Sequence, residues 1–107
     1  MTTIPEPVAS FVAAVNRQDE PAFLGAFTDT GYVDDWGRVF SGRNAIKAWS
    51  DVEFLGSHGT LTPDTVTEEG DTVTVVGDWA SSHANGRSRF EFTVAGDKIA
   101  AMIIREG

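Results

Sequence analysis

The chain has no cysteine and only eight lysine and arginine residues among its 107 residues. The absence of cysteine excludes disulfides, thiolate metal ligands and cysteine nucleophiles. Sixteen acidic residues outnumber the basic ones and give a net charge of −8, and the basic residues are scattered along the chain. Nucleic acids and anionic membranes bind clustered basic side chains. We therefore expect neither of them as a partner.

Several recognisable segments are also missing. No apolar run is long enough to span a bilayer, and the N-terminal stretch lacks the basic and apolar regions of a signal peptide. We therefore expect a cytoplasmic protein. The chain has no glycine-rich phosphate loop, no G-x-S-x-G elbow and no Rossmann fingerprint. Its two histidines, His58 and His83, lack metal-ligand spacing. We expect neither a metal nor a cofactor.

Apolar residues recur at helical spacing in the first half of the chain. Residues 8–15 carry them at i, i+3, i+4 and i+7, which predicts an amphipathic helix. Asp19 is placed to cap a second, short helix with Pro21 in its first turn. Ser41 is a suitable N-cap for a third helix over residues 42–54. The sequence thus predicts three helices, all in the N-terminal half.

Strand patterns dominate the rest. A strand is predicted over residues 32–36, followed by a turn at Gly37. Four longer strands follow, with a break at Pro63 and an Asn-Gly hairpin signal at 85–86; their ranges are 60–67, 72–79, 87–94 and 98–105. Helices set apart from a sheet indicate the α+β class. We expect one domain over residues 1–107, a cone-shaped, strongly curved mixed or antiparallel sheet that encloses a pocket with the three helices.

The predicted strand 32–36 contains two adjacent carboxylates. Side chains alternate along a strand, so Asp34 and Asp35 point to opposite faces, and Asp35 shares its face with Val33. A carboxylate in an apolar cleft has a raised pKa, which suits proton abstraction next to a carbonyl. Asp35 is therefore a candidate catalytic residue. The alternative is a strand-end aspartate that bonds to the Gly37 turn.

Three tryptophans and one histidine are further candidates. Trp36, Trp49 and Trp79 suit the walls of a pocket for flat, apolar ligands. Core packing is favoured for each of them taken alone, but we expect at least one of the three to line a pocket. His58 follows the third predicted helix near the expected pocket mouth, where it would shuttle a proton. The alternative is a surface loop position, which is also our expectation for His83.

The run from Phe11 to Trp36, followed by Phe-Ser-Gly-Arg-Asn-Ala-Ile at 40–46, resembles the nuclear transport factor 2-like superfamily. That superfamily includes ketosteroid isomerases, SnoaL-like polyketide cyclases and limonene epoxide hydrolases. The resemblance covers nearly the whole chain. It implies the cone fold, a homodimer and an apolar small-molecule ligand. It is nearly silent on the reaction, because this fold hosts enzymes and non-catalytic binders alike.

Comparison with ketosteroid isomerases implies roles for individual residues. Their general-base aspartate falls on Asp35, and two residues of their steroid pocket fall on Trp49 and Met102. Their two oxyanion donors fall on Phe11 and Phe90, which donate no hydrogen bond. These two positions therefore remain candidates for ligand contact only, and the steroid-isomerase reaction loses its donors.

The limonene epoxide hydrolases use an Asp-Arg-Asp relay to activate water. Asp78, Arg89 and Glu91 supply similar residue types on two neighbouring predicted strands. Ion pairing on the outer sheet face explains the same residues more simply.

Taken together, these features predict a SnoaL-like, cofactor-independent enzyme that acts on an apolar carbonyl compound. Asp35 would be its general base or acid and His58 an auxiliary. The ligand-binding candidates are Phe11, Trp36, Trp49, Trp79, Phe90 and Met102. A non-catalytic hydrophobic-ligand-binding module and a dimerisation module of the same fold are the alternatives.

Overall fold

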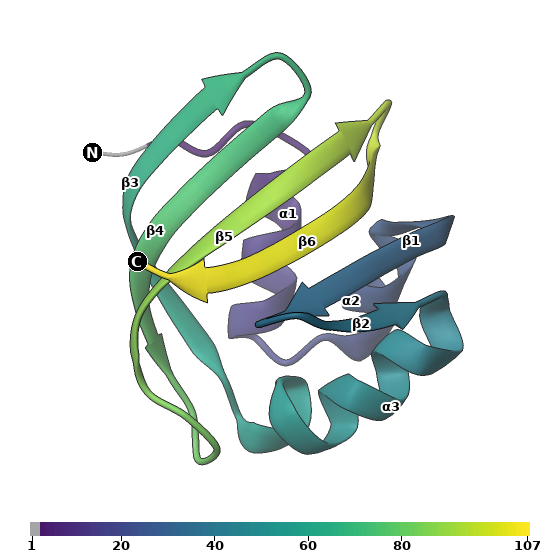
Figure 1. Cartoon of the computed structure of the whole chain (residues 1–107), viewed down its shortest axis with the longest axis vertical. Helices are drawn as coiled ribbons and strands as arrows, with labels where there is room; N and C mark the ends of the chain where they lie inside the picture. Colours follow the sequence, from purple (N-terminus) through teal and green to yellow (C-terminus); the bar gives the residue numbers. More distant parts are fainter. Residues whose placement is uncertain (1–2) are drawn as a thin grey trace.

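The computed structural model describes residues 3–107 and contains three α-helices, one short 3-10 helix and six strands (Figure 1). The elements follow one another as α1 (Val8–Asn16), α2 (Glu20–Gly25), β1 (Phe27–Asp35), β2 (Arg38–Ser41), α3 (Arg43–Glu53), η1 (Leu55–Ser57), β3 (Thr60–Glu69), β4 (Thr72–Ala80), β5 (Gly86–Ala95) and β6 (Lys98–Glu106).

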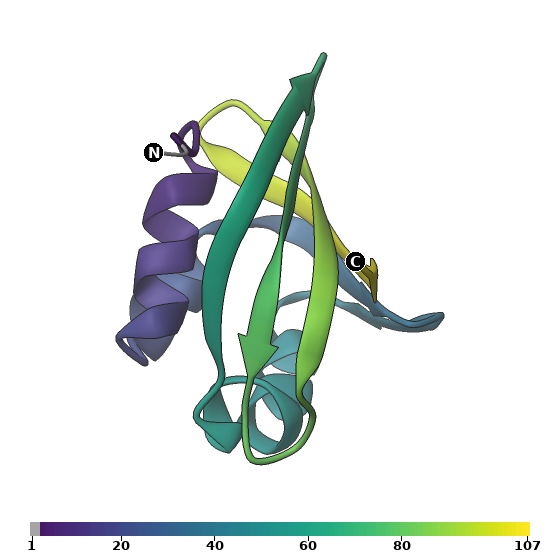
Figure 2. The ribbon, with the colours of Figure 1, turned by 90° about the vertical axis from the view of Figure 1, so that its left-hand side faces the viewer.

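The strands form one open sheet in the order β2-β1-β6-β5-β4-β3. Only β1 and β6 run parallel, and every other neighbouring pair is antiparallel. The sheet curves strongly, and the helices lie on its concave side (Figures 1 and 2). The α+β class and the cone of mixed sheet closed by N-terminal helices, both predicted from the sequence, are confirmed.

Of the two helix N-caps predicted from the sequence, one is found in the structure and one is not. Asp19 caps α2 as expected, since its Oδ1 accepts from the Ala22 amide at 3.2 Å. The prediction that Ser41 caps α3 is wrong. Ser41 instead ends β2, where it pairs with Tyr32, and Gly42 is the N-cap residue at a φ of 85°. The sheet therefore continues one residue further than the capping pattern indicated.

Two other boundaries differ from the prediction. β1 begins at Phe27 rather than at Tyr32, because Phe27 already pairs with Ile99 of β6. The Asn-Gly signal at 85–86 does not make a two-residue turn. Gly86 is already paired with Trp79 in the sheet, and residues 81–85 form the β4–β5 loop.

The curvature has a local origin in β3 and β4. The register between these strands shifts between Pro63 and Thr65, where the sequence predicts a break. Gly77 lies opposite the shift and is buried. A Cβ atom on Gly77 would lie 2.2 Å from the Thr62 carbonyl oxygen, so only glycine allows the two strands to approach this closely.

The interior between helices and sheet is packed with aromatic rings. The Phe11 ring lies 5.3–5.5 Å from those of Phe23, Phe27 and Phe92. The space next to this cluster has a volume of only about 10 Å³, too small for any ligand. The interior of the cone is therefore a core and not a cavity.

Gly77→Ala should lower the free energy of unfolding by about 1–3 kcal/mol, because the added methyl group forces the bulged strands apart. Gly25→Ala, at the end of α2, is the matched control, since a Cβ there meets nothing within 4 Å. Urea unfolding of both variants tests this. Equal midpoints for the two would contradict the close approach of Gly77 to β3.

Candidate functional site

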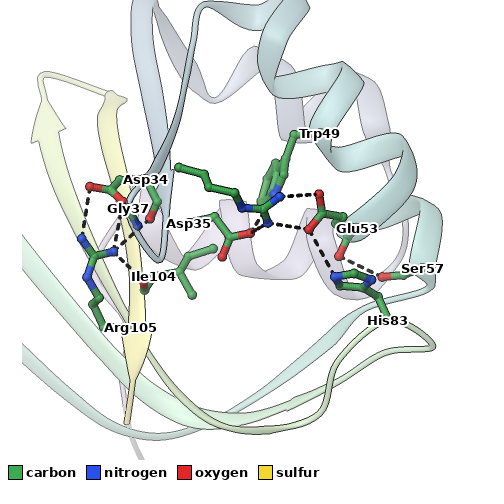
Figure 3. Close-up of polar contacts among 10 residues, drawn as sticks. Asp34, Asp35, Gly37, Trp49, Glu53, Ser57, His83, Ile104 and Arg105 are labelled. Carbon is green, nitrogen blue, oxygen red and sulfur yellow. Dashed lines mark hydrogen bonds and ion pairs between the residues drawn. The ribbon is translucent and has the colours of Figure 1, made fainter.

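A cleft of about 620 Å³ opens at one end of the molecule. Its walls come from the β1–β2 turn, the C-terminal half of α3, the β4–β5 loop and the ends of β5 and β6. Its lining includes Asp35, Trp36, Arg38, Trp49, Glu53 and His83. Figure 3 shows Asp35, Trp49, Glu53 and His83 gathered on one side of the sheet and Asp34 with Arg105 on the other.

The floor of the cleft is aromatic. The rings of Trp49, Phe54 and Trp79 are stacked, with centroids 4.7 Å and 4.5 Å apart, and all three side chains are buried. Phe90 continues the floor beside Trp79. Trp36, in contrast, is 59% exposed and lies at the rim. The stack separates the cleft from the packed core.

A tight turn brings the first charged pair together. Asp35 and Arg38 are paired residues of β1 and β2, and the two residues between them both have positive φ, 54° for Trp36 and 93° for Gly37. Two-residue hairpins favour this backbone, although a bulky residue adopts it only at an energetic cost. The turn places Arg38 Nη2 2.6 Å from Asp35 Oδ2. Trp49 Nε1 donates to the same oxygen at 3.1 Å.

Arg38 also holds Glu53, the last residue of α3. Its Nη2 and Nη1 donate to Glu53 Oε1 and Oε2 at 2.5 Å and 3.0 Å. His83 Nε2 lies 3.2 Å from Glu53 Oε1. The hydrogen bonds from Arg38 are the main cause that lowers the pKa of Glu53 below its ordinary value, against burial, which raises it. The bonds to Glu53, and secondarily to Asp35, raise the pKa of Arg38.

Asp34 makes its contacts on the opposite face of β1, as strand alternation predicts. Its carboxylate accepts from Arg105 at 3.1 Å and 3.2 Å and from the Gly37 amide at 2.8 Å. Arg105 first, and the Gly37 amide second, lower the pKa of Asp34. Asp34, not Asp35, is thus the aspartate that bonds to the Gly37 turn. It braces the turn that carries Asp35 and Arg38.

The structure brings five of the eight predicted site residues to the cleft: Asp35, Trp36, Trp49, Trp79 and Phe90. The other three lie elsewhere. Phe11 is enclosed by the phenylalanine rings of the core, and Met102 is fully buried between its strand neighbours Val33 and Phe92. His58 is an exposed residue at the end of η1 and is not part of the cleft wall.

Sequence reasoning did not assign Arg38, Glu53 or His83 to the site, although all three line the cleft. Glu53 continues the apolar stripe of α3 beyond Trp49, which is a weak signal for an inward-facing carboxylate. His83 was expected to be solvated, and nothing in the local sequence of its loop indicates its contact with Glu53.

Asp78, Arg89 and Glu91, the residues of relay type, do not line this cleft. Arg89 Nε lies 3.2 Å from Glu91 on the same strand, and Asp78 is paired with Arg87 across the sheet. Among residues 3–107, no group of three or more histidine or acidic side chains is arranged to hold a metal ion. In the same part of the chain, no helix has the length and apolar character needed to cross a membrane.

The brace at Asp34 should make stability depend on pH. The pKa of Asp34 is lower in the folded state than in the unfolded chain. The ionised carboxylate therefore stabilises the folded state at pH values above the ordinary aspartate pKa of about 3.9, and this stabilisation is lost as the pH falls through the pKa of the folded state. Asp34→Asn should therefore lose less stability between pH 6 and pH 3 than the wild type does. Asp97→Asn, in the exposed β5–β6 turn, is the control. Urea titrations at several pH values measure the difference, and parallel curves for wild type and Asp34→Asn would contradict the brace.

The fold recurs in solved structures of low sequence identity. A candidate polyketide cyclase from Sinorhizobium meliloti superposes with a TM-score of 0.83 at 21% identity, covering 95% of both chains. SalBIII, an epoxide hydrolase/cyclase-like enzyme with a role in pyran ring formation in the polyether salinomycin, gives 0.83 at 22%, covering 94% of this chain and 87% of its own.

A protein with a ketosteroid isomerase-like fold from Catenulispora acidiphila, in complex with trimethylamine, gives a TM-score of 0.77 at 22% identity, covering 98% of this chain and 88% of that one. None of the proteins of curated function matches this chain. The family model of the SnoaL-like domain matches residues 8–102, nearly the whole chain. The resemblance found in the sequence is thereby confirmed, and the chain belongs to the SnoaL-like domain family.

Proposed function

We propose that the chain is a cofactor-independent acid–base enzyme of the cyclase or isomerase type, acting on an apolar carbonyl compound. The observation that carries the proposal is the position of Asp35 in the cleft. Both recorded hydrogen bonds to its carboxylate, from Arg38 and Trp49, use Oδ2. Oδ1 is then the oxygen that meets a ligand. A carboxylate fixed by one oxygen and available at the other suits a proton-transfer group.

The shape and lining of the cleft support a small, flat, apolar ligand. A volume of about 620 Å³ falls in the range of small-molecule sites. The Trp49–Phe54–Trp79 stack offers apolar ring edges at the floor, and the exposed ring of Trp36 stands at the rim to cover a bound molecule. The likeness to SalBIII and to the candidate polyketide cyclase supports cyclase chemistry in particular.

Abstraction of a proton beside a carbonyl builds negative charge on the carbonyl oxygen, and this charge needs a partner. Phe11 and Phe90, which occupy the positions of the two ketosteroid isomerase donors, have no hydrogen-bond donor that could stabilise this charge. Arg38 is the cation beside Asp35, and its guanidinium group carries five N–H donors. We assign to Arg38 the role of stabilising the enolate oxygen while it holds Asp35 in place.

The alternative function is a non-catalytic binding module for the same class of ligand. Arg38 is already paired with both carboxylates that it contacts, and the ketosteroid isomerase donors are replaced by phenylalanine. The small-molecule complex of the Catenulispora acidiphila protein supports binding by this fold. In this case the cleft holds its ligand without exchanging a proton.

Hydrogen–deuterium exchange on 2-tetralone, a flat apolar ketone, tests the proposal. The wild type should accelerate exchange of the α protons in D₂O, measured by proton NMR. Asp35→Asn should slow the protein-catalysed exchange about 100-fold or more, the usual effect of removing a general base. Asp78→Asn, an exposed aspartate on β4, is the matched control and should exchange at the wild-type rate.

Undiminished exchange by Asp35→Asn would show that Asp35 is not the base. Quenching of tryptophan fluorescence by 2-tetralone measures binding in parallel, because Trp36, Trp49 and Trp79 all line the cleft. A wild-type protein that binds the ketone without accelerating exchange would instead establish the binding module.

A further inference from the structure

We propose that Trp79, held in place by Gly59, sets the size of the ligand, so that the cleft accepts compounds of one or two fused rings and excludes longer ring systems. The inference rests on the proposed function for the class of ligand, an apolar ketone that lies beside Asp35. It follows from a wall of aromatic rings that the cleft shares with the packed core.

The cleft and the small gap in the core are separated by this shared wall. Among residues 3–107, the side chains that border both spaces are those of Phe54, Trp79 and Phe90. The volume is about 620 Å³ on the cleft side and about 10 Å³ on the core side. The Trp79 ring contacts both of the others, with centroids 4.5 Å from Phe54 and 5.9 Å from Phe90. It therefore closes the path by which a ligand would enter the core.

The stacked rings run from the candidate base to this wall. Trp49 donates to Asp35 at 3.1 Å, Phe54 is stacked on Trp49, and Trp79 is stacked on Phe54. Trp79 is thus the ring of the stack that lies furthest from Asp35. The centroid spacings of 4.7 Å and 4.5 Å make the stack comparable in length with two fused six-membered rings. A ketone with its carbonyl group at Asp35 therefore has its far end at Trp79.

Much of the remaining lining is polar and favours no third ring. The β4–β5 loop and the ends of β5 and β6 contribute His83, Asn85, Arg87 and Glu106. An apolar ring placed against such groups removes their water without offering hydrogen bonds in return. A longer ring system would gain apolar contact only inside the core, and Trp79 blocks that route.

Gly59 holds the Trp79 ring from behind. Gly59 is buried, and a Cβ atom on it would overlap Cζ2 and Cη2 of the Trp79 ring. The backbone at this position is fixed, because the Gly59 amide donates to the Phe54 carbonyl at 3.2 Å and the Gly59 carbonyl accepts from Gln18 Nε2 at 3.0 Å. Of the two spaces that the ring borders, only the cleft has room for it. A methyl group at position 59 would therefore push the indole ring into the cleft and shorten it.

A series of ketones with the same reactive end tests the size limit. Cyclohexanone, 2-tetralone and 3,4-dihydroanthracen-2(1H)-one have one, two and three fused rings. Ligand-observed NMR titration gives the Kd of each ketone, and exchange of the α protons in D₂O gives the rate. The wild type should bind 2-tetralone about 10-fold or more tightly than the three-ring ketone, the usual discrimination of a fitted apolar pocket.

Trp79→Ala should raise the affinity for the three-ring ketone relative to 2-tetralone about 10-fold or more. The space left by the indole ring then joins the cleft, and apolar cavities made by deleting a large side chain bind aromatic molecules. Phe27→Ala is the matched control. It deletes another buried ring, which borders neither the cleft nor the small gap, and it should keep the wild-type ratio of affinities.

Gly59→Ala should act in the opposite direction, and it keeps the test valid if Trp79→Ala does not fold. It should weaken the binding of 2-tetralone about 10-fold relative to cyclohexanone, because the displaced indole ring shortens the cleft. The effect should disappear in the double variant with Trp79→Ala, where the ring that the new Cβ atom meets is gone. Gly25→Ala is the control for Gly59→Ala, since a Cβ atom there meets nothing within 4 Å.

Wild-type affinity ratios in both Trp79→Ala and Gly59→Ala would overturn the size limit. So would a wild type that binds the three-ring ketone as tightly as 2-tetralone. A wild type that discriminates the ketones by size but exchanges none of them supports the size limit and overturns the catalytic role of Asp35. A wild type that binds no ketone of the series overturns both, so the two failures are distinguishable.

Discussion

The guanidinium group of Arg38 is the interaction on which the cleft depends. It joins β2 to Asp35 of β1 and to Glu53 of α3, so one side chain ties together the three elements that form this wall. Two carboxylates this close to each other repel unless a cation lies between them. Because Arg38 is half exposed, solvent weakens its ion pairs, and their contribution to stability is small. The main effect of these ion pairs is to fix the positions of the Asp35 and Glu53 carboxylates.

The second constraint is the boundary between core and cleft. Buried apolar side chains fill the space between the helices and the sheet, and several phenylalanine rings lie at its centre. The stacked rings of Trp49, Phe54 and Trp79 form the last layer of that core and the floor of the cleft at once. The cleft is therefore displaced toward the open end of the cone. That displacement explains why Phe11 and Met102, which the family comparison implies for a deeper pocket, are core residues here.

Local patterns in the sequence predicted most of the fold and part of the site. The Asp19 cap, the break at Pro63 and the opposite directions of Asp34 and Asp35 all depend on neighbours in the chain, and all three are found. The Ser41 cap and the Asn-Gly turn failed because pairing with other strands extended β2 and β5. The Arg38–Glu53–His83 cluster was missed for a related reason. Its members are 15 and 30 positions apart, and only the tertiary structure brings them together.

The contacts of Glu53 and Asp35 also explain why these two carboxylates would have different roles. Both oxygens of Glu53 are engaged by Arg38, and one of them also faces His83. Such a group orients its neighbours and has little capacity left for a substrate. Asp35 is engaged through a single oxygen. In the proposed function, the same arginine would make Glu53 a positioning residue and leave Asp35 free to exchange a proton through its other oxygen. Asp35 and Glu53 carry the same carboxylate group. The difference between their proposed roles would therefore come only from their unequal contacts with Arg38, which engages both oxygens of Glu53 and one oxygen of Asp35.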